Sequence, residues 1–266
     1  MNLQEISTYC ADYIRGEDKD RYVLSLFAPP EHRGALWALF AFNAEIAKTR
    51  EVVTETSLGL MRLLWWREGV QEIYEGTCRD HPVLLGVRDA IERYDLPLKL
   101  FEDMTYGREF DLEDVVPGNI DGLFNYCDFT HTPLLKLCDQ IIGMEEESSL
   151  KNLAIRYSIA GNLRSLVAHA HQHRCYLPQD AMEEVGLSEA QIYELKNLMG
   201  LENIVQKIIE KLPDAPSFDT KFFKAYNGLA LIYLKQIERL GYDLLDYRLT
   251  LPPMLKELRL WKAATF

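Results

Sequence analysis

The stretch that decides the fold runs from Arg33 to Glu51 and reads RGALWALFAFNAEIAKTRE. Its apolar residues recur with the period of an α-helix whose apolar face packs into a core. Pro29 and Pro30 stand just before it, and proline is tolerated where a helix begins. We therefore predict a helix from about Glu31 to Val53.

Helical periodicity continues along the rest of the chain, and alternating β-branched runs are nearly absent, so we predict an all-α fold. Glycines and prolines mark the expected helix ends. In the first half we predict a helix capped by Thr56 or Ser57 and ending near Gly76, a helix starting at His81-Pro82, and a helix after Asp95-Leu96-Pro97 that carries Phe101 to Asp114. In the middle we predict a helix pair or one kinked helix from Asn119 to Gly143, one helix from Leu150 to about His173, and short helices from Pro178 and Ser188. At the end we predict a linker from Leu212 to Phe218, followed by helices from Thr220 to Tyr247 and from Pro252. No shift in composition divides the chain, so we expect a single domain, residues 1–266.

Composition excludes several classes of protein. The chain is 48% hydrophobic and carries a net charge of −12, which provides for a large core and repels phosphate backbones, so nucleic acid is not an expected partner. The five cysteines form no paired motif and are expected to be reduced thiols. No apolar run approaches the ~20 residues of a membrane span, and the first residues show no leader. We therefore expect a cytoplasmic protein, or one that is mature after processing.

Three stretches combine residues in a way that generic helices do not. They are Arg33–Asn43 (RGALWALFAFN), Tyr106–Leu112 (YGREFDL) with Leu123–Cys127 (LFNYC), and Ala160–Arg164 (AGNLR) with Arg174–Pro178 (RCYLP). In this order and at these spacings they resemble the squalene/phytoene synthase family over roughly Asp20 to Gly186. The resemblance implies an isoprenoid-synthase-type helical bundle around a central cavity.

The chemistry of that family depends on carboxylates one helical turn apart, which hold Mg²⁺ and a diphosphate. The resemblance places the corresponding positions of this chain on Ala47, Lys48, Glu51, Gly161, Ser165 and His169. Only Glu51 is a carboxylate. We therefore expect no metal cofactor and no catalytic residue, with Mg²⁺ required only if the chain is an enzyme after all.

A narrower resemblance comes from Ala41–Ala47 (AFNAEIA), Val53–Arg62 (VTETSLGLMR) and Trp66–Tyr74 (WREGVQEIY). These stretches are similar to a branch of the family that also lacks the aspartates and includes the mitochondrial assembly factor for respiratory complex I. The resemblance implies a noncatalytic role in assembling that complex, with a respiratory subunit as partner. It implies a location in the cytoplasm, or in the mitochondrial matrix of a eukaryote, with at most peripheral contact with the inner membrane. The alternatives are a prenyltransferase that condenses prenyl diphosphates and a protein that binds a lipid or prenyl chain.

The candidate cavity-lining or binding residues follow from the same register. They are Asn43, Glu45, Ala47, Lys48, Glu51, Asp111, Gly161, Arg164, Ser165, His169, Arg174 and Tyr176. We expect Glu45, Lys48, Glu51 and Arg164 to point toward the cavity, either as an ion-pair network in place of the metal or as a solvated face. For Asp111, with Arg108 and Glu109, we favour a structural role over a role in binding.

Two further features have alternative interpretations. The histidines of His169–His173 alternate, a spacing that does not converge on one ion in a helix, so we interpret them as a solvated helix end. Leu255–Lys262 is basic and amphipathic, and we expect a packed terminal helix, with a membrane-surface helix as the alternative.

Overall fold

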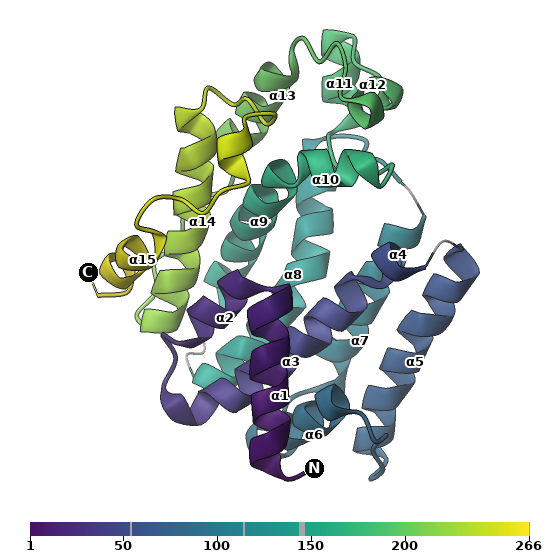
Figure 1. The fold of residues 1–266 in the computed structure, drawn as a ribbon, viewed down its shortest axis with the longest axis vertical. Coiled ribbons are helices and arrows are strands. Elements are labelled where there is room, and N and C mark those ends of the chain that lie inside the picture. The colour runs from purple at the N-terminus through teal and green to yellow at the C-terminus, as the bar shows by residue number, and fades with distance from the viewer. Residues whose placement is uncertain (54, 114, 144–146, 266) are drawn as a thin grey trace. The chain divides into compact units, whose positions relative to one another are not determined.

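The computed structural model describes residues 1–53, 55–113, 115–143 and 147–265, and within them the chain is helical without a strand (Figure 1). The predicted all-α fold is confirmed. The elements are α1 (Leu3–Glu17), α2 (Lys19–Ser25), α3 (Pro30–Ala47), α4 (Thr49–Val52), α5 (Thr56–Tyr74), α6 (Pro82–Tyr94), α7 (Leu98–Glu109), η1 (Phe110–Leu112), α8 (Ile120–Ile142), α9 (Glu147–Arg164), α10 (Leu166–His171), α11 (Gln179–Val185), α12 (Glu189–Glu194), α13 (Leu201–Glu210), α14 (Lys221–Arg239), η2 (Tyr247–Leu249) and α15 (Lys256–Thr265).

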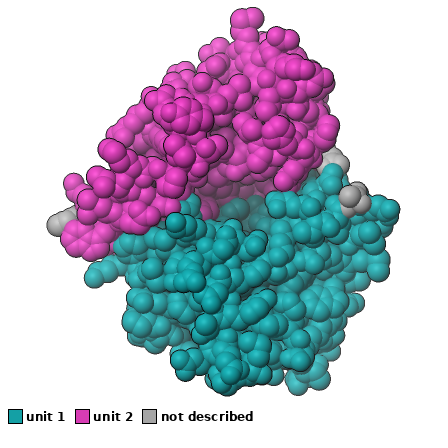
Figure 2. Space-filling model, in the orientation of Figure 1, with its two compact units in different colours: residues 1–113, 129–147, 220–222 teal, residues 114–128, 148–219, 223–266 magenta. Residues whose placement is uncertain are grey.

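The chain forms two compact units, which Figure 2 colours separately. Unit 1 comprises Met1–Glu113, Phe129–Glu147 and Thr220–Phe222, and unit 2 comprises Asp114–Asp128, Ser148–Asp219 and Phe223–Phe266. The expected single domain stays a prediction.

Helix α3 forms the centre of unit 1, where it packs against α1 and α6. Leu36, Leu39 and Phe40 on it are fully buried. Phe42 meets Trp66 of α5 and Phe101 of α7 edge-on, with ring centroids 5.9 and 5.6 Å apart. Such edge contacts stabilise beyond the area they bury, so α3 is the apolar helix around which α5 and α7 are placed.

Helix α14 supplies much of the core of unit 2. Phe223 and Tyr226 on it are fully buried, and the Tyr226 ring lies 4.7 Å from that of Tyr157 on α9. A Cβ added at Gly228 would come within 2.7 Å of the Cβ of Ala263 on α15. Glycine therefore allows α15 to approach α14 more closely than any other residue would.

Two predicted helices are interrupted, so their predicted extents are wrong. Helix α3 ends at Ala47 because Lys48 has ψ near 0° and its N–H bonds to both Ala44 O and Ile46 O. Helix α9 ends at Arg164, and Ser165, at φ −95° and ψ 10°, separates it from α10. Both interruptions fall inside the stretches that resemble the family's metal-binding helices.

Other predicted boundaries were partly right. Gly76, at φ +90°, follows the end of α5 as predicted, whereas Glu55 and not Thr56 or Ser57 occupies the N-cap, without a side-chain bond. Ser188 caps α12 through a reciprocal bond pair with Gln191, and α11 follows Pro178. The stretch predicted as a helix pair or one kinked helix from Asn119 to Gly143 contains one helix, α8, with Pro133 inside it.

The last helices are shorter than predicted. Helix α14 ends at Arg239 and not at Tyr247, because Gly241 and Tyr242 take positive φ values of 66° and 64°. The final helix begins at Lys256 and not at Pro252. Among the described residues, no helix combines the length and the apolar character that crossing a bilayer requires.

Candidate functional site

Glu45 is the centre of a polar cluster at the carboxyl end of α3, in unit 1. The Tyr13 hydroxyl donates to Glu45 Oε1 at 2.5 Å, and the Lys48 ammonium lies 2.8 Å from the same oxygen. The Arg62 guanidinium donates to Oε2 at 2.5 Å, and Lys48 also donates to the Tyr13 hydroxyl. The Glu45 cluster, defined as Tyr13, Glu45, Lys48 and Arg62, thus joins α1, α3 and α5 through one buried carboxylate.

Electrostatics keep this cluster ionised. Burial alone would raise the pKa of Glu45, but hydrogen bonds from Lys48 and Tyr13, and the charges of Lys48 and Arg62, lower it below its ordinary value. Burial, and then the bond to Glu45, raise the pKa of Tyr13 far above its ordinary value. At neutral pH Glu45 is therefore a carboxylate and Tyr13 is a neutral phenol, and neither of these two groups is poised to exchange a proton.

The predicted former metal positions of unit 1 do not form a carboxylate face. Ala47 is partly buried, Glu51 is exposed, and Lys48 is bound into the Glu45 cluster. Asn43 is 3% exposed, and its Oδ1 has no hydrogen-bond partner among the described residues. Mg²⁺ requires oxygen ligands in near-octahedral geometry, which a methyl group and a paired ammonium do not provide, so these residues do not fit the ion.

Asp111 lies in η1 and pairs with Arg108 one turn earlier. Arg108 Nη1 is 3.2 Å from Asp111 Oδ2, and the side chains are 10% and 4% exposed. The neighbouring Glu109 pairs with Arg67 of α5, whose guanidinium lies 3.6 Å from the centre of the Tyr106 ring. The Arg108–Asp111 pair joins α7 to η1, and the contacts of Arg67 join α5 to α7. These contacts favour a structural role for Asp111.

In unit 2, Gly161, Ser165 and His169 mark one side of α9 and α10. A Cβ added at Gly161 would meet no atom within 4 Å, Ser165 sits at the break between the helices, and the His169 ring lies edge-on to Tyr176 at 4.8 Å. None of the three is a carboxylate. This side provides no hard anionic ligand for a metal.

Tyr176 contacts two of the other unit 2 candidates, His169 and Arg174. Its ring stacks on Tyr126 at 5.2 Å, and Arg174 donates to its hydroxyl. It also borders a cavity of about 10 Å³, room for about one water, whose walls are Leu123, Ile159, Asn162, Leu163, Leu166, His169, Tyr176 and Leu177. The walls of this cavity are mostly apolar.

Arg164, the last residue of α9, is held within unit 2. Its guanidinium lies 3.7 Å from the centre of the Tyr233 ring on α14 and donates to Leu249 O at 3.1 Å. Its Nε is buried without a hydrogen-bond partner among the described residues. The expected single network of Glu45, Lys48, Glu51 and Arg164 stays a prediction, with the Glu45–Lys48 pair present inside unit 1.

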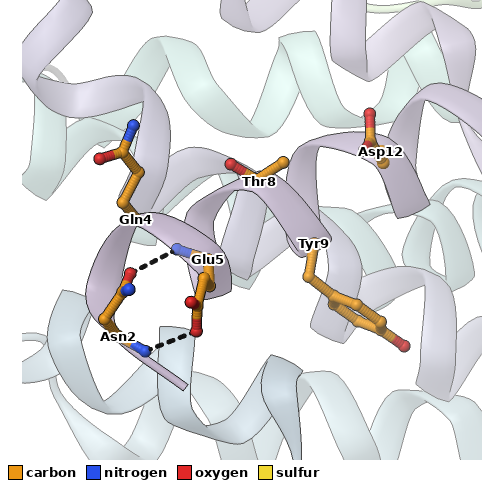
Figure 3. A pocket seen from close by; sticks show the side chains of 6 residues that line it. All are labelled: Asn2, Gln4, Glu5, Thr8, Tyr9 and Asp12. Carbon is orange, nitrogen blue, oxygen red and sulfur yellow. Dashed lines mark hydrogen bonds between the residues drawn. The ribbon is translucent and has the colours of Figure 1, made fainter.

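Two other places were candidates for a site. A hollow of about 470 Å³ on α1 is lined only by polar and aromatic side chains of that helix and the residue before it, and the Asn2–Glu5 capping box forms one edge of it (Figure 3). His171 is exposed, and His173, at φ +53°, places its ring 5.3 Å from Tyr193. In the described part of the chain, no three His, Cys, Asp or Glu side chains are grouped to hold a metal ion.

The sequence did not identify Tyr13 or Arg62 as members of the site. The spacing of Glu45 and Lys48, three residues apart on a helix, was a visible signal for a pair. The other two partners come from α1 and α5, and no local spacing predicts a contact over 32 or 17 residues.

Comparison with known proteins places these features in a family. The chain is 28% identical to complex I assembly factor 6 of Bos taurus over 96% of its own length and 81% of that protein. It is 26% identical to phytoene synthase 1 of Arabidopsis thaliana over 69% of its length and 44% of that protein. A dehydrosqualene synthase crystal structure has the same fold, with a TM-score of 0.78, 17% identity and coverage of 98% of this chain and 96% of that one. Residues 14–254 match the sequence model of squalene/phytoene synthase, and the chain therefore belongs to the squalene/phytoene synthase family.

Proposed function

We propose that this chain is a noncatalytic member of its family that acts in the assembly of respiratory complex I. The observation that carries the proposal is the Lys48 ammonium, 2.8 Å from Glu45 Oε1, at a position that the family resemblance assigns to a metal-binding aspartate. Its similarity to complex I assembly factors supports the same role.

The charge of the substrates supports the noncatalytic interpretation. Prenyl transfer moves a diphosphate out of a poorly solvated site, and Mg²⁺ is what neutralises that leaving group. Lys48 and Arg62 are cations, but both are bound to Glu45 and so have much of their charge already compensated. On the unit 2 side, Gly161, Ser165 and His169 add no carboxylate.

The proposed partner is a subunit or assembly intermediate of complex I. The proposed location is the inner face of the respiratory membrane, where that complex is assembled. Prenyl transfer and binding of a lipid or prenyl chain are the alternatives. Native mass spectrometry of the protein purified from cells distinguishes the second alternative, because a bound chain would add its mass to the protein. We expect the mass of the polypeptide alone.

Deletion of the gene in the source organism tests the assembly role. We expect the amount of complex I on native gels and its NADH oxidation to fall, while the other respiratory complexes keep their normal amounts. Both should return with the wild-type gene and equally with Glu51→Gln, since the surviving carboxylate is not needed as a metal ligand. Normal complex I in the deletion strain would contradict the proposal.

A further inference from the structure

Unit 2 exposes a concentration of large apolar side chains near the end of the described chain. Seven such side chains between residues 245 and 261 are exposed: Leu245, Tyr247, Leu251, Met254, Leu255, Leu258 and Trp261. Met254 is 84% exposed, and Trp261 is 58% exposed. Single exposed apolar residues are normal on a protein surface, but a contiguous group marks an interaction site.

The packing of α15 fixes which side chains face outward. Lys256, Leu260 and Ala264 form its buried side, and Ala263 faces Gly228 on α14 at close range. Leu258 and Trp261, three residues apart, therefore lie together on the outer side, and Met254 and Leu255 lead into the helix. These four residues, with Arg259 and Lys262, are called the α15 face. Its apolar side chains are exposed because α15 is already docked through its other side.

The charge of this segment is opposite to that of the chain. Residues 245–262 contain four basic and two acidic side chains, within a chain of net charge −12. Salt screens charges beyond about 8–10 Å, so a surface that touches the α15 face senses mainly Arg259, Lys262 and Glu257. Long-range repulsion by the rest of the protein does not cancel this local attraction to anions.

We propose that the α15 face binds the surface of an anionic lipid bilayer. Leu258, Trp261 and Met254 enter the boundary between headgroups and acyl chains, while Arg259 and Lys262 lie at the level of the lipid phosphates. Interfacial helices combine these features: leucine and tryptophan on one side, with arginine and lysine beside them. The proposal is independent of the assembly role, because it assigns a surface and its ligand and no client.

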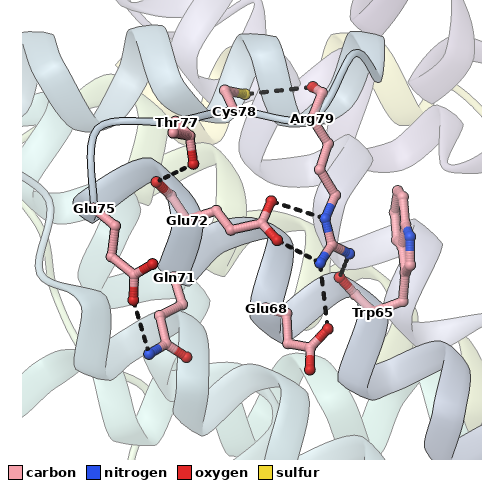
Figure 4. A network of polar contacts seen from close by, with 8 residues as sticks. All are labelled: Trp65, Glu68, Gln71, Glu72, Glu75, Thr77, Cys78 and Arg79. Carbon is pink, nitrogen blue, oxygen red and sulfur yellow. Dashed lines mark hydrogen bonds and ion pairs between the residues drawn. The ribbon is translucent and has the colours of Figure 1, made fainter.

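A second exposed apolar face, on α5 of unit 1, has the wrong charge for the same ligand. Leu58, Leu60, Met61, Leu64 and Trp65 are exposed there. Glu68, Glu72 and Glu75 continue the helix, and Arg79 compensates only part of their charge, pairing with Glu72 at 2.6 Å and Glu68 at 3.3 Å (Figure 4). An acidic border opposes an anionic membrane, so the α5 face provides a matched control.

Co-sedimentation of the 266-residue protein with vesicles tests the proposal. We expect binding to vesicles of phosphatidylcholine mixed with phosphatidylglycerol, little binding to phosphatidylcholine alone, and weaker binding in high salt. Leu258→Ser with Trp261→Ser should lower the partition coefficient about tenfold or more. Lys262→Gln should lower it about fivefold. The control, Met61→Ser with Leu64→Ser, changes equally exposed side chains on α5 and should bind as the wild type does.

Three results would overturn the proposal. The first is that the wild type does not bind anionic vesicles, and the second is that the α15 and α5 double variants lose vesicle binding equally. The third is that light scattering detects self-association of the wild type but not of the Leu258→Ser, Trp261→Ser protein. The last result would assign the face to a second copy of the chain. Circular dichroism checks that each variant is folded. If the double variant does not fold, Lys262→Gln still tests the proposal, because Lys262 is exposed.

Discussion

At the scale of single residues, Glu45 of α3 joins its own helix to α1 and α5. One carboxylate, 8% exposed, accepts from Tyr13, Lys48 and Arg62. Removing a buried charge that has partners is costly because the partners remain, desolvated and unpaired. The family's chemistry would place metal-bound carboxylates beside this point, whereas here the charges compensate one another within the protein.

Replacing Glu45 by Gln is therefore expected to destabilise the protein. The loss should be about 2 kcal/mol, below the value for a fully buried pair, because Lys48 and Arg62 are 25% and 30% exposed. Urea unfolding at neutral pH measures it as a lower midpoint with an unchanged slope. Glu51→Gln, on an exposed side chain, is the matched control and should unfold as the wild type does; an equal midpoint for both variants would contradict the importance of the cluster.

The same carboxylate predicts a dependence of stability on pH. The pKa of Glu45 in the folded protein is lowered from 4.5, so its stabilising contribution is complete above about 4.5 and is lost as the pH falls through the lowered pKa. The difference in unfolding free energy between the wild type and Glu45→Gln should therefore shrink below pH 4.5. A difference that stays constant or grows on acidification would show that the charge of Glu45 is not what stabilises the cluster.

At the scale of elements, the sequence predicted most of the long helices better than it predicted their ends, but it did not predict α1. Proline, serine and glycine signals worked at Pro178, Ser188 and Gly76, because each acts on the backbone within a few residues of itself. The breaks at Lys48 and Ser165 carry no such signal. They depend on what the helix meets in three dimensions, as Lys48 shows by turning its side chain to Glu45 and Tyr13.

Helix α15 is held by a close approach that one methyl group would disturb. A Cβ at residue 228 would lie 2.7 Å from the Ala263 Cβ, and a Cβ atom cannot rotate away. Gly228→Ala should destabilise by about 1–3 kcal/mol, and adding Ala263→Gly should recover part of the loss. The unfolding midpoints of the two single variants and the double variant measure this coupling.

Gly161→Ala in α9 provides the comparison for that experiment. Its new methyl group meets no atom within 4 Å, and alanine is the better helix former by roughly 0.5–1 kcal/mol. We expect unchanged or higher stability. Equal losses at Gly228 and Gly161 would mean that the α14–α15 contact is not the cause.

At the scale of the whole molecule, the chain has the fold of the family, and we propose that it lacks the chemistry of the family. The resemblance of three motifs predicted the family and the all-α fold because hydrophobic periodicity and motif order survive at low identity. It also assigned the former metal positions, Ala47, Lys48 and Gly161 among them. It could not show that Lys48 would contact Tyr13, that Glu45 would pair with Arg62, or that Arg164 would lie over Tyr233, since these partners lie far apart in sequence.

Turnover of prenyl diphosphates tests the central claim most directly. The purified protein is incubated with Mg²⁺ and either geranylgeranyl diphosphate alone or farnesyl diphosphate with NADPH as the hydride donor. Release of diphosphate and formation of the condensed hydrocarbon are followed, with a squalene or phytoene synthase as the positive control. We expect no product above the rate without protein, for the wild type and for Glu51→Gln alike. Turnover by the wild type that Glu51→Gln abolishes would contradict a noncatalytic protein.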